Sequence, residues 1–176
     1  MHVLMLFFLL MLTTAAGAQA PRVRCTERQV KSNDPEIKDP VLRTTCYLGS
    51  YRFIETAFPD YAGRYVEREH SVFVRVQGRW QRTTNSRVFN GRQGELLARI
   101  NRGIREEWEG FRADSNTRDC MEGVAAPPRY GMNDLAISFH DGAIWFSVEW
   151  DVPMACRAVG GAIITFPLKD VAQYLR

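Results

Sequence analysis

Alternating apolar and polar residues in the second half of the chain predict a β-hairpin. The stretch LAISFHDGAIWFSVEW, residues 135–150, has an apolar residue at every second position on both sides of His140-Asp141-Gly142. Such alternation is typical of strands that bury one face. Aspartate and glycine tolerate the positive φ angles of a tight hairpin turn. We therefore interpret His140 and Asp141 as turn residues and not as a catalytic pair.

The same alternation predicts strands in the first half. In VFVRV, residues 72–76, valines alternate with other residues, and Gln77-Gly78 follows as a turn signal. We expect the valines to face the core and Arg75 to reach water. Apolar and β-branched residues over 42–58 indicate further strand structure, and the polar segment around Cys25 is predicted to be an edge strand.

Between Gly94 and Phe111 the apolar period becomes that of a helix. Gly110 predicts the end of this helix, and Gly103 would permit close packing on a sheet. We interpret its arginines as a solvated face paired with glutamates rather than as a binding surface. The apolar residues at helical spacing are Leu96, Leu97, Ile100, Ile104, Trp108 and Phe111. The expected glutamate partners are Glu95, Glu106 and Glu109.

The end of the chain predicts a short buried strand and a short helix. AIITF at 162–166 is the strand, and Pro167 opens the final helical turn. With 112–131 interpreted as a loop, the pattern predicts an α+β fold in which strands lie beneath one main helix. No repeat or domain boundary is indicated, so residues 19–176 are predicted to form a single domain.

Residues 1–18 are predicted to be a secretory signal peptide. An unbroken apolar run over Val3–Leu12 precedes two A-x-A patterns that end at Ala18 and Ala20. We expect cleavage near one of these alanines and a periplasmic or secreted mature protein. The apolar run is too short to cross a bilayer, and no later segment is apolar enough, so we expect no stable membrane insertion.

Four cysteines remain in the mature chain: Cys25, Cys46, Cys120 and Cys156. An even number in an oxidising compartment suggests disulfides, and three pairings are possible. We favour Cys25–Cys46 and Cys120–Cys156, because each closes a loop within its own half. The alternative, a four-cysteine metal site, lacks any C-x-x-C spacing.

The net charge and the absence of known site motifs argue against several functions. The net charge is +3, and the basic residues, nearly all arginine, are dispersed along the sequence, which argues against a nucleic-acid partner. His70 and His140 lie in no ligand motif, and no nucleophile elbow, phosphate loop or dinucleotide fingerprint occurs. We therefore predict no catalytic residue, no metal and no cofactor.

Aromatic and acidic residues near the end of the second hairpin strand could form a surface for glycan contact. We favour the other interpretation, core packing for Trp150 and plain exposure for Glu149. The Asp151–Gly161 loop could instead insert into the cleft of another protein. The candidate binding residues are Tyr130, Trp145, Glu149, Asp151, Pro153 and Met154.

Residues 86–176 resemble a known envelope domain. The stretches GELLARINRGIREEW, DLAISFHDGAIWFSVEWDVPMACRAVGG and IITFPLKDVAQYL occur in the order seen in the domain of unknown function shared by the anti-sigma factor RsiV and the peptidoglycan deacetylase PdaC. The resemblance implies an α+β fold with a helix packed on a curved antiparallel sheet. In RsiV this domain binds lysozyme, and in PdaC it accompanies a separate catalytic domain. The resemblance thus implies peptidoglycan or a lysozyme-like protein as partner.

The sequence supports three functional hypotheses. We favour a non-catalytic exported binding module that acts at the cell envelope on a glycan or a secreted protein. The alternative is an inhibitor or immunity-type protein against a secreted wall hydrolase. A hydrolase with an unrecognised carboxylate site is less favoured, because it needs converging acidic residues in a pocket.

Overall fold

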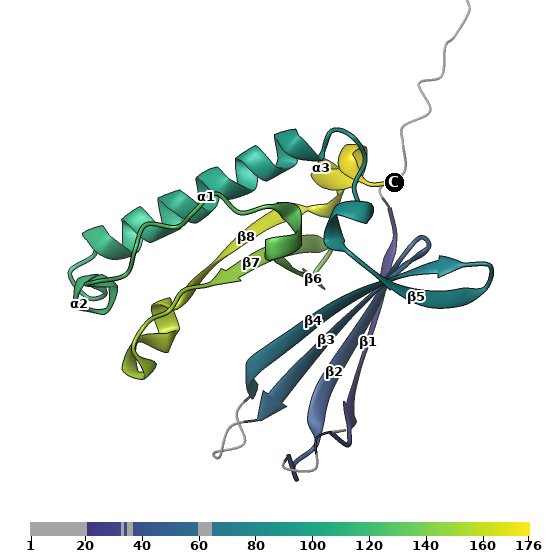
Figure 1. Cartoon of the computed structure of the whole chain (residues 1–176), viewed down its shortest axis with the longest axis horizontal. Coiled ribbons are helices and arrows are strands. Elements are labelled where there is room, and N and C mark those ends of the chain that lie inside the picture. Colours follow the sequence, from purple (N-terminus) through teal and green to yellow (C-terminus); the bar gives the residue numbers. More distant parts are fainter. Residues whose placement is uncertain (1–20, 33, 35–36, 60–64) are drawn as a thin grey trace, which may run out of the picture.

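Two antiparallel sheets and one long helix make up the fold (Figure 1). The computed structural model describes residues 21–32, 34, 37–59 and 65–176, so the predicted signal peptide lies outside the described residues. The first sheet contains, in chain order, β1 (Val23–Val30), β2 (Val41–Leu48), β3 (Tyr51–Pro59), β4 (Tyr65–Val76) and β5 (Arg79–Thr83). The second contains β6 (Ala136–His140), β7 (Ala143–Glu149) and β8 (Gly161–Pro167). The helices are α1 (Gln93–Ala113), α2 (Arg118–Met121) and α3 (Leu168–Val171).

This arrangement confirms the predicted α+β class, with antiparallel strands, one main helix and a short C-terminal helix. The strands are divided between two sheets, and α1 packs on the three-stranded one. The strand β1 lies at the edge of the five-stranded sheet, as predicted for the segment around Cys25.

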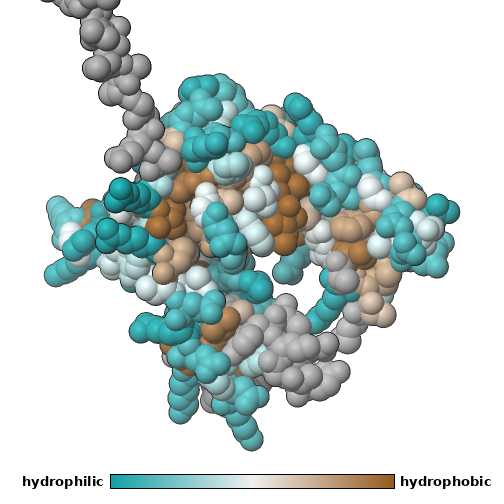
Figure 2. All heavy atoms as spheres, turned by 180° about the vertical axis from the view of Figure 1, so that it is seen from behind, coloured by the Kyte–Doolittle hydropathy of each residue, from teal (hydrophilic) through white to brown (hydrophobic). Residues whose placement is uncertain are grey.

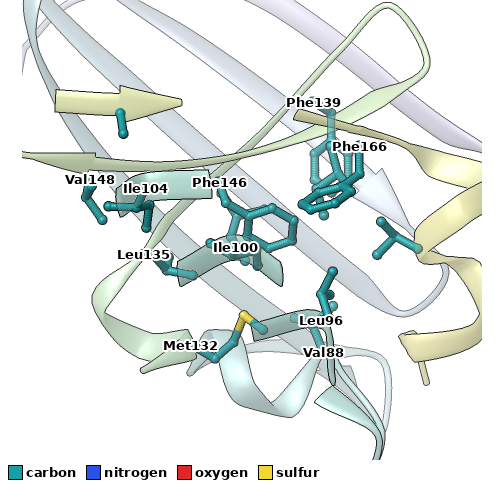
Figure 3. Close-up of a cluster of buried hydrophobic side chains, with 14 of the residues drawn as sticks. Val88, Leu96, Ile100, Ile104, Met132, Leu135, Phe139, Phe146, Val148 and Phe166 are labelled. Carbon is teal, nitrogen blue, oxygen red and sulfur yellow. The ribbon is translucent and has the colours of Figure 1, made fainter. Parts of the chain in front are cut away.

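The core lies between α1 and the three-stranded sheet (Figure 3). Apolar side chains of α1 and of alternate strand positions are buried there: Leu96, Ile100, Ile104, Trp108, Ile144, Phe146, Val148, Ala162 and Phe166. Close approach depends on Gly103, because a Cβ atom at this position would lie 2.9 Å from Cδ1 of Ile164 on β8. The prediction that Gly103 permits close packing is therefore confirmed.

The five-stranded sheet meets this core with one face only. On that inner face, the ring of Phe53 lies 4.8 Å from the ring of Phe139 on β6, and Val72 is buried beside it. The hydroxyl of Tyr51 donates a hydrogen bond to the carbonyl of Arg87 at 2.7 Å. Side chains that alternate with these residues point to the opposite, outer face.

Local structure differs from the sequence prediction at three places. The helix α1 continues past Gly110, and it ends where the backbone N–H of Asp114 bonds to the Gly110 carbonyl. A short helix, α2, lies within 112–131, which was predicted to be a loop. The strand β8 buries only one face, since Ile163 is 53 % exposed, so the prediction of a buried strand is wrong for its other face.

The hairpin turn between β6 and β7 follows the prediction. Asp141 and Gly142 have φ angles of 48° and 77°, and His140 pairs directly with Ala143 across the turn. This is the geometry of a two-residue turn with both central residues left-handed, which aspartate and glycine tolerate.

Candidate functional site

The outer face of the five-stranded sheet carries arginine and aromatic side chains in one cross-strand row. Antiparallel partners share a face, so the register of the four strand pairs places one residue of each strand in this row. In the order of the strands, the row consists of Arg24, Tyr47, Arg52, Phe73 and Arg82. We call these five residues the arginine–aromatic row. No helix covers this face in the described part of the chain (Figure 1).

Aromatic rings hold the central arginine of the row in place. The guanidinium carbon of Arg52 lies 4.6 Å from the ring centroid of Phe73 and 4.8 Å from that of Trp80. Trp80 in turn contacts Tyr47, with ring centroids 5.9 Å apart. Cation–π attraction of this kind stabilises a flat guanidinium against the rings. Because Arg52 is already oriented, binding an anion there costs less side-chain entropy than at a freely moving arginine.

The outer face has an excess of positive charge. Arginines from five strands share it: Arg24, Arg28, Arg43, Arg52, Arg75 and Arg82. Glu67 and Glu69 on β4 are the acidic residues that the register places on this face. None of the six arginines makes an ion pair with a carboxylate of the described residues. The Nε atoms of Arg43 and Arg52 are buried without a hydrogen-bond partner there. An anionic ligand on this face could therefore bind these two guanidinium groups only through their terminal nitrogens.

The fold concentrates positive charge that is spread out along the sequence. The basic residues are dispersed along the sequence, but strand pairing brings six of them onto one face of the folded chain. The missed signal was local: Arg24 and Arg28 alternate with Cys25 and Glu27 along β1, which is the pattern of a strand with an arginine-bearing face.

A second polar cluster lies where the two sheets meet. Glu55 on β3 is 8 % exposed, and Arg68 on β4 forms an ion pair with it. His70 is the register partner of Glu55, and its Nδ1 is buried without a hydrogen-bond partner in the described residues. Burial lowers the pKa of His70 below its ordinary value, and Arg68 lowers it further. Glu55, Glu149 and the backbone of Ile137 oppose this shift without reversing it.

The lowered pKa of His70 predicts a loss of stability in weak acid. Below pH 6.5, the ordinary pKa of histidine, the unfolded chain binds a proton that folded His70 takes up less readily. The free energy of unfolding therefore falls as the pH drops from about 7 towards the lowered pKa. We expect this fall to be smaller in His70→Asn, measured by urea unfolding from about pH 7 to about pH 5.5.

His140→Asn is the matched control, because it removes an imidazole at the hairpin turn, away from Glu55. Its stability should follow the pH in the same way as that of the parent protein. Parallel curves for the parent and His70→Asn would show that His70 does not couple protonation to folding.

The structure does not bring all the predicted binding residues together. Trp145 and Glu149 alternate with the buried residues of β7, so they lie on the face of the three-stranded sheet opposite α1. The ring of His140 packs 4.3 Å from that of Trp145. The Tyr130 backbone is instead held beside α1, where its N–H and carbonyl bond to the side chain of Asn101. Tyr130 and Trp145 therefore do not share one surface.

The Asp151–Gly161 loop is anchored by a disulfide. Asp151 and Pro153 are exposed, and the side chain of Met154 lies outside the described part of the structure. Trp150, just before the loop, is buried with its ring 6.1 Å from that of Phe111, so the core alternative for this tryptophan is confirmed. Insertion of the loop into a partner's cleft stays a prediction.

The cysteines form the favoured pairs. Cys25–Cys46 joins β1 to β2, and Cys120–Cys156 joins α2 to the Asp151–Gly161 loop. These bonds leave no thiol among the described cysteines, which overturns the alternative of a four-cysteine metal site. Among the described residues, no group of three histidine, cysteine or acidic side chains is arranged to hold a metal ion.

The helix arginines differ in their surroundings. Glu95 pairs with Arg92, which directly precedes α1, whereas Glu106 and Glu109 make no ion pair within the described residues. The guanidinium of Arg99 lies over the ring of Phe166 at 4.7 Å.

The cavities that open on the described surface include two of several hundred cubic ångströms. The first, of about 340 Å³, lies between α1 and residues 127–129 and is lined by Arg102, Arg105 and Arg129. The second, of about 570 Å³, lies between the start of β1 and the β6–β7 turn. Neither is lined by more than one carboxylate.

The comparisons with known proteins add no identification. No family model, curated protein or solved structure matches the chain. The resemblance of residues 86–176 to the envelope domain stays an expectation. Across the ranges that the structure describes, no helix has both the length and the apolar character needed to cross a bilayer.

Proposed function

We propose that this chain is an exported, non-catalytic binding module that acts at the cell envelope through the outer face of its five-stranded sheet. The arginine–aromatic row is the observation that carries the proposal. Its guanidinium groups can bind carboxylates or phosphates in bidentate fashion, and its rings offer apolar faces beside them. Such a surface recognises a ligand by charge and shape and needs no reactive group.

Two further observations support an envelope location. The predicted signal peptide directs export, and the two disulfides are consistent with an oxidising compartment.

Viewed from behind, the surface is mainly hydrophilic, with apolar residues in separate patches (Figure 2). This pattern favours a polar or charged ligand over a broad apolar interface on the side shown.

Retention on purified peptidoglycan sacculi tests the proposal. We expect the triple variant Arg24→Gln, Arg52→Gln, Arg82→Gln to lose at least about tenfold in retention, since each lost charge-assisted hydrogen bond costs about 1.5–3 kcal/mol. Glutamine keeps the polar character and much of the stem of arginine. Circular dichroism and the melting temperature show whether the variant folds.

The matched control is Arg102→Gln, Arg105→Gln, Arg129→Gln. It removes the same charge from three exposed arginines around the 340 Å³ cavity and leaves the sheet unchanged. We expect nearly full retention of this control. Equal losses in both triple variants would show that net charge, and not the outer face, governs binding. Full retention of a folded sheet variant would refute the proposed site.

A further inference from the structure

We infer that the arginine–aromatic row binds a linear acidic polysaccharide that carries one anionic group on every second sugar. The inference rests on the proposed function and deepens it, because it names the chemical class of the ligand. It places the polysaccharide across the strands, so that acidic sugars lie over Arg24, Arg52 and Arg82.

The spacing of the row supports this ligand. The three arginines belong to β1, β3 and β5, which are alternate strands of the sheet. Alternate strands lie about 10 Å apart, because neighbouring strands are separated by about 4.8 Å. An extended disaccharide has about this length, so a charge on every second sugar matches the backbone spacing of an arginine on every second strand.

One of the residues between the arginines, Tyr47, suits a neutral sugar. Tyr47 and Phe73 belong to the intervening strands, β2 and β4. Tyr47 is 39 % exposed. An exposed aromatic ring packs well against the C–H groups on one face of a sugar, through dispersion and burial of apolar area. Tyr47 therefore offers a site for a neutral ring between Arg24 and Arg52, whereas the Phe73 ring is covered on one side by the Arg52 guanidinium.

No carboxylate of the described residues pairs with the arginines of the row, so these arginines are available to bind an anionic ligand. On the outer face, the acidic residue nearest to Arg52 by register is Glu69, which pairs with Thr56, four residues along β3 from Arg52. Arg52 is held by its aromatic neighbours and not by a carboxylate. A nucleic-acid strand carries a phosphate on every nucleotide, which is a denser charge pattern than that of the row. The predicted export also favours a polysaccharide.

Titration calorimetry with defined polymers tests the inference. Hyaluronan carries one carboxylate per disaccharide, polygalacturonate carries one on every sugar, and an N-acetylglucosamine oligomer carries none. We expect hyaluronan to bind at least about tenfold more tightly than the neutral oligomer, as the gain from charge-assisted hydrogen bonds predicts. It should also bind more tightly than polygalacturonate at equal chain length. The affinity should fall between 0.05 and 0.5 M salt, where screening increases.

Two variants localise the effect. Arg24→Gln, Arg82→Gln removes the outer two arginines from the edge strands, and we expect it to weaken hyaluronan binding about tenfold or more. Arg102→Gln, Arg105→Gln is the matched control and should bind as the parent does. An equal loss in the control would overturn the assignment to the row.

The polymers separate failure of this inference from failure of the proposed function. If the sheet variants lose retention on sacculi but the neutral oligomer binds as well as hyaluronan, the outer face is the site and the acidic-polysaccharide inference is wrong. Equal affinity for polygalacturonate would overturn the alternate-sugar spacing. Tighter binding of single-stranded oligo-dT than of any polysaccharide would overturn the ligand class.

Discussion

Phe146→Ala is expected to lower the free energy of unfolding by about 3–5 kcal/mol, the range for removing a buried phenylalanine ring. Phe146 is fully buried at the centre of β7, where its ring lies 6.0 Å from the rings of both Phe89 and Phe166. Phe89 precedes α1 and Phe166 lies on β8, so the neighbours come from different segments and cannot all close around the vacated volume; Figure 3 shows Phe146 within this buried cluster. Urea unfolding followed by circular dichroism measures the loss.

Ile163→Ala is the control for this prediction. Ile163 lies on the adjacent strand β8 but on the opposite face, where it is 53 % exposed. We expect it to cost less than about 1 kcal/mol. Similar losses at the two positions would contradict the assignment of the buried face of this sheet.

Removing the Cys120–Cys156 disulfide is expected to cost about 4 kcal/mol, from the loop-closure entropy that the bond removes from the unfolded chain. The two cysteines are 36 residues apart in sequence. The bond also anchors the Asp151–Gly161 loop to α2, so its loss should expose both segments to proteolysis. The double variant Cys120→Ala, Cys156→Ala tests this by urea unfolding and limited trypsin digestion.

Cys25→Ala, Cys46→Ala is the comparison variant. It opens a loop with a sequence separation of 21 between two strands that pair directly, so we expect a loss of about 3 kcal/mol. Its new trypsin sites should lie in β1 and β2. If the Cys120–Cys156 variant were instead as stable as the parent, the disulfide would not contribute to the stability of this half.

The second half of the fold could be predicted because its signals are local. Alternation over 135–150 identifies two strands and their buried face, since side chains one residue apart point to opposite sides of a strand. Asp141-Gly142 identifies the turn, and the helical spacing of Leu96, Ile100 and Ile104 identifies the core face of α1. All of these features depend on residues within a few positions of one another.

Other features depend on contacts between distant segments. Gly110 was predicted to end α1, but no left-handed residue follows it, and Asp114 ends the helix instead. The position of Tyr130 depends on Asn101, far earlier in the chain. The pattern within one segment does not show contacts with a distant segment. We therefore predicted one surface for Tyr130 and Trp145, whereas the fold separates them.

The arginine–aromatic row shows this limit most clearly. Arg24, Arg52 and Arg82 lie about 30 residues apart, and only the register of five strands aligns them. A shift of one residue in any strand pair would move that strand's member to the inner face. The alternation of Phe73 and Arg75 with the buried-face valines gave a partial signal for an arginine- and aromatic-bearing outer face.

NMR mapping of a bound polysaccharide shows whether the outer face of the five-stranded sheet is the binding surface, as we propose. In a titration of the isotope-labelled protein with hyaluronan oligomers, we predict the largest shifts at the backbone amides of Arg24, Tyr47, Arg52, Phe73 and Arg82 and at the arginine Nε–H groups. Shifts confined to α1, to the Trp145 face of the small sheet or to the Asp151–Gly161 loop would contradict it.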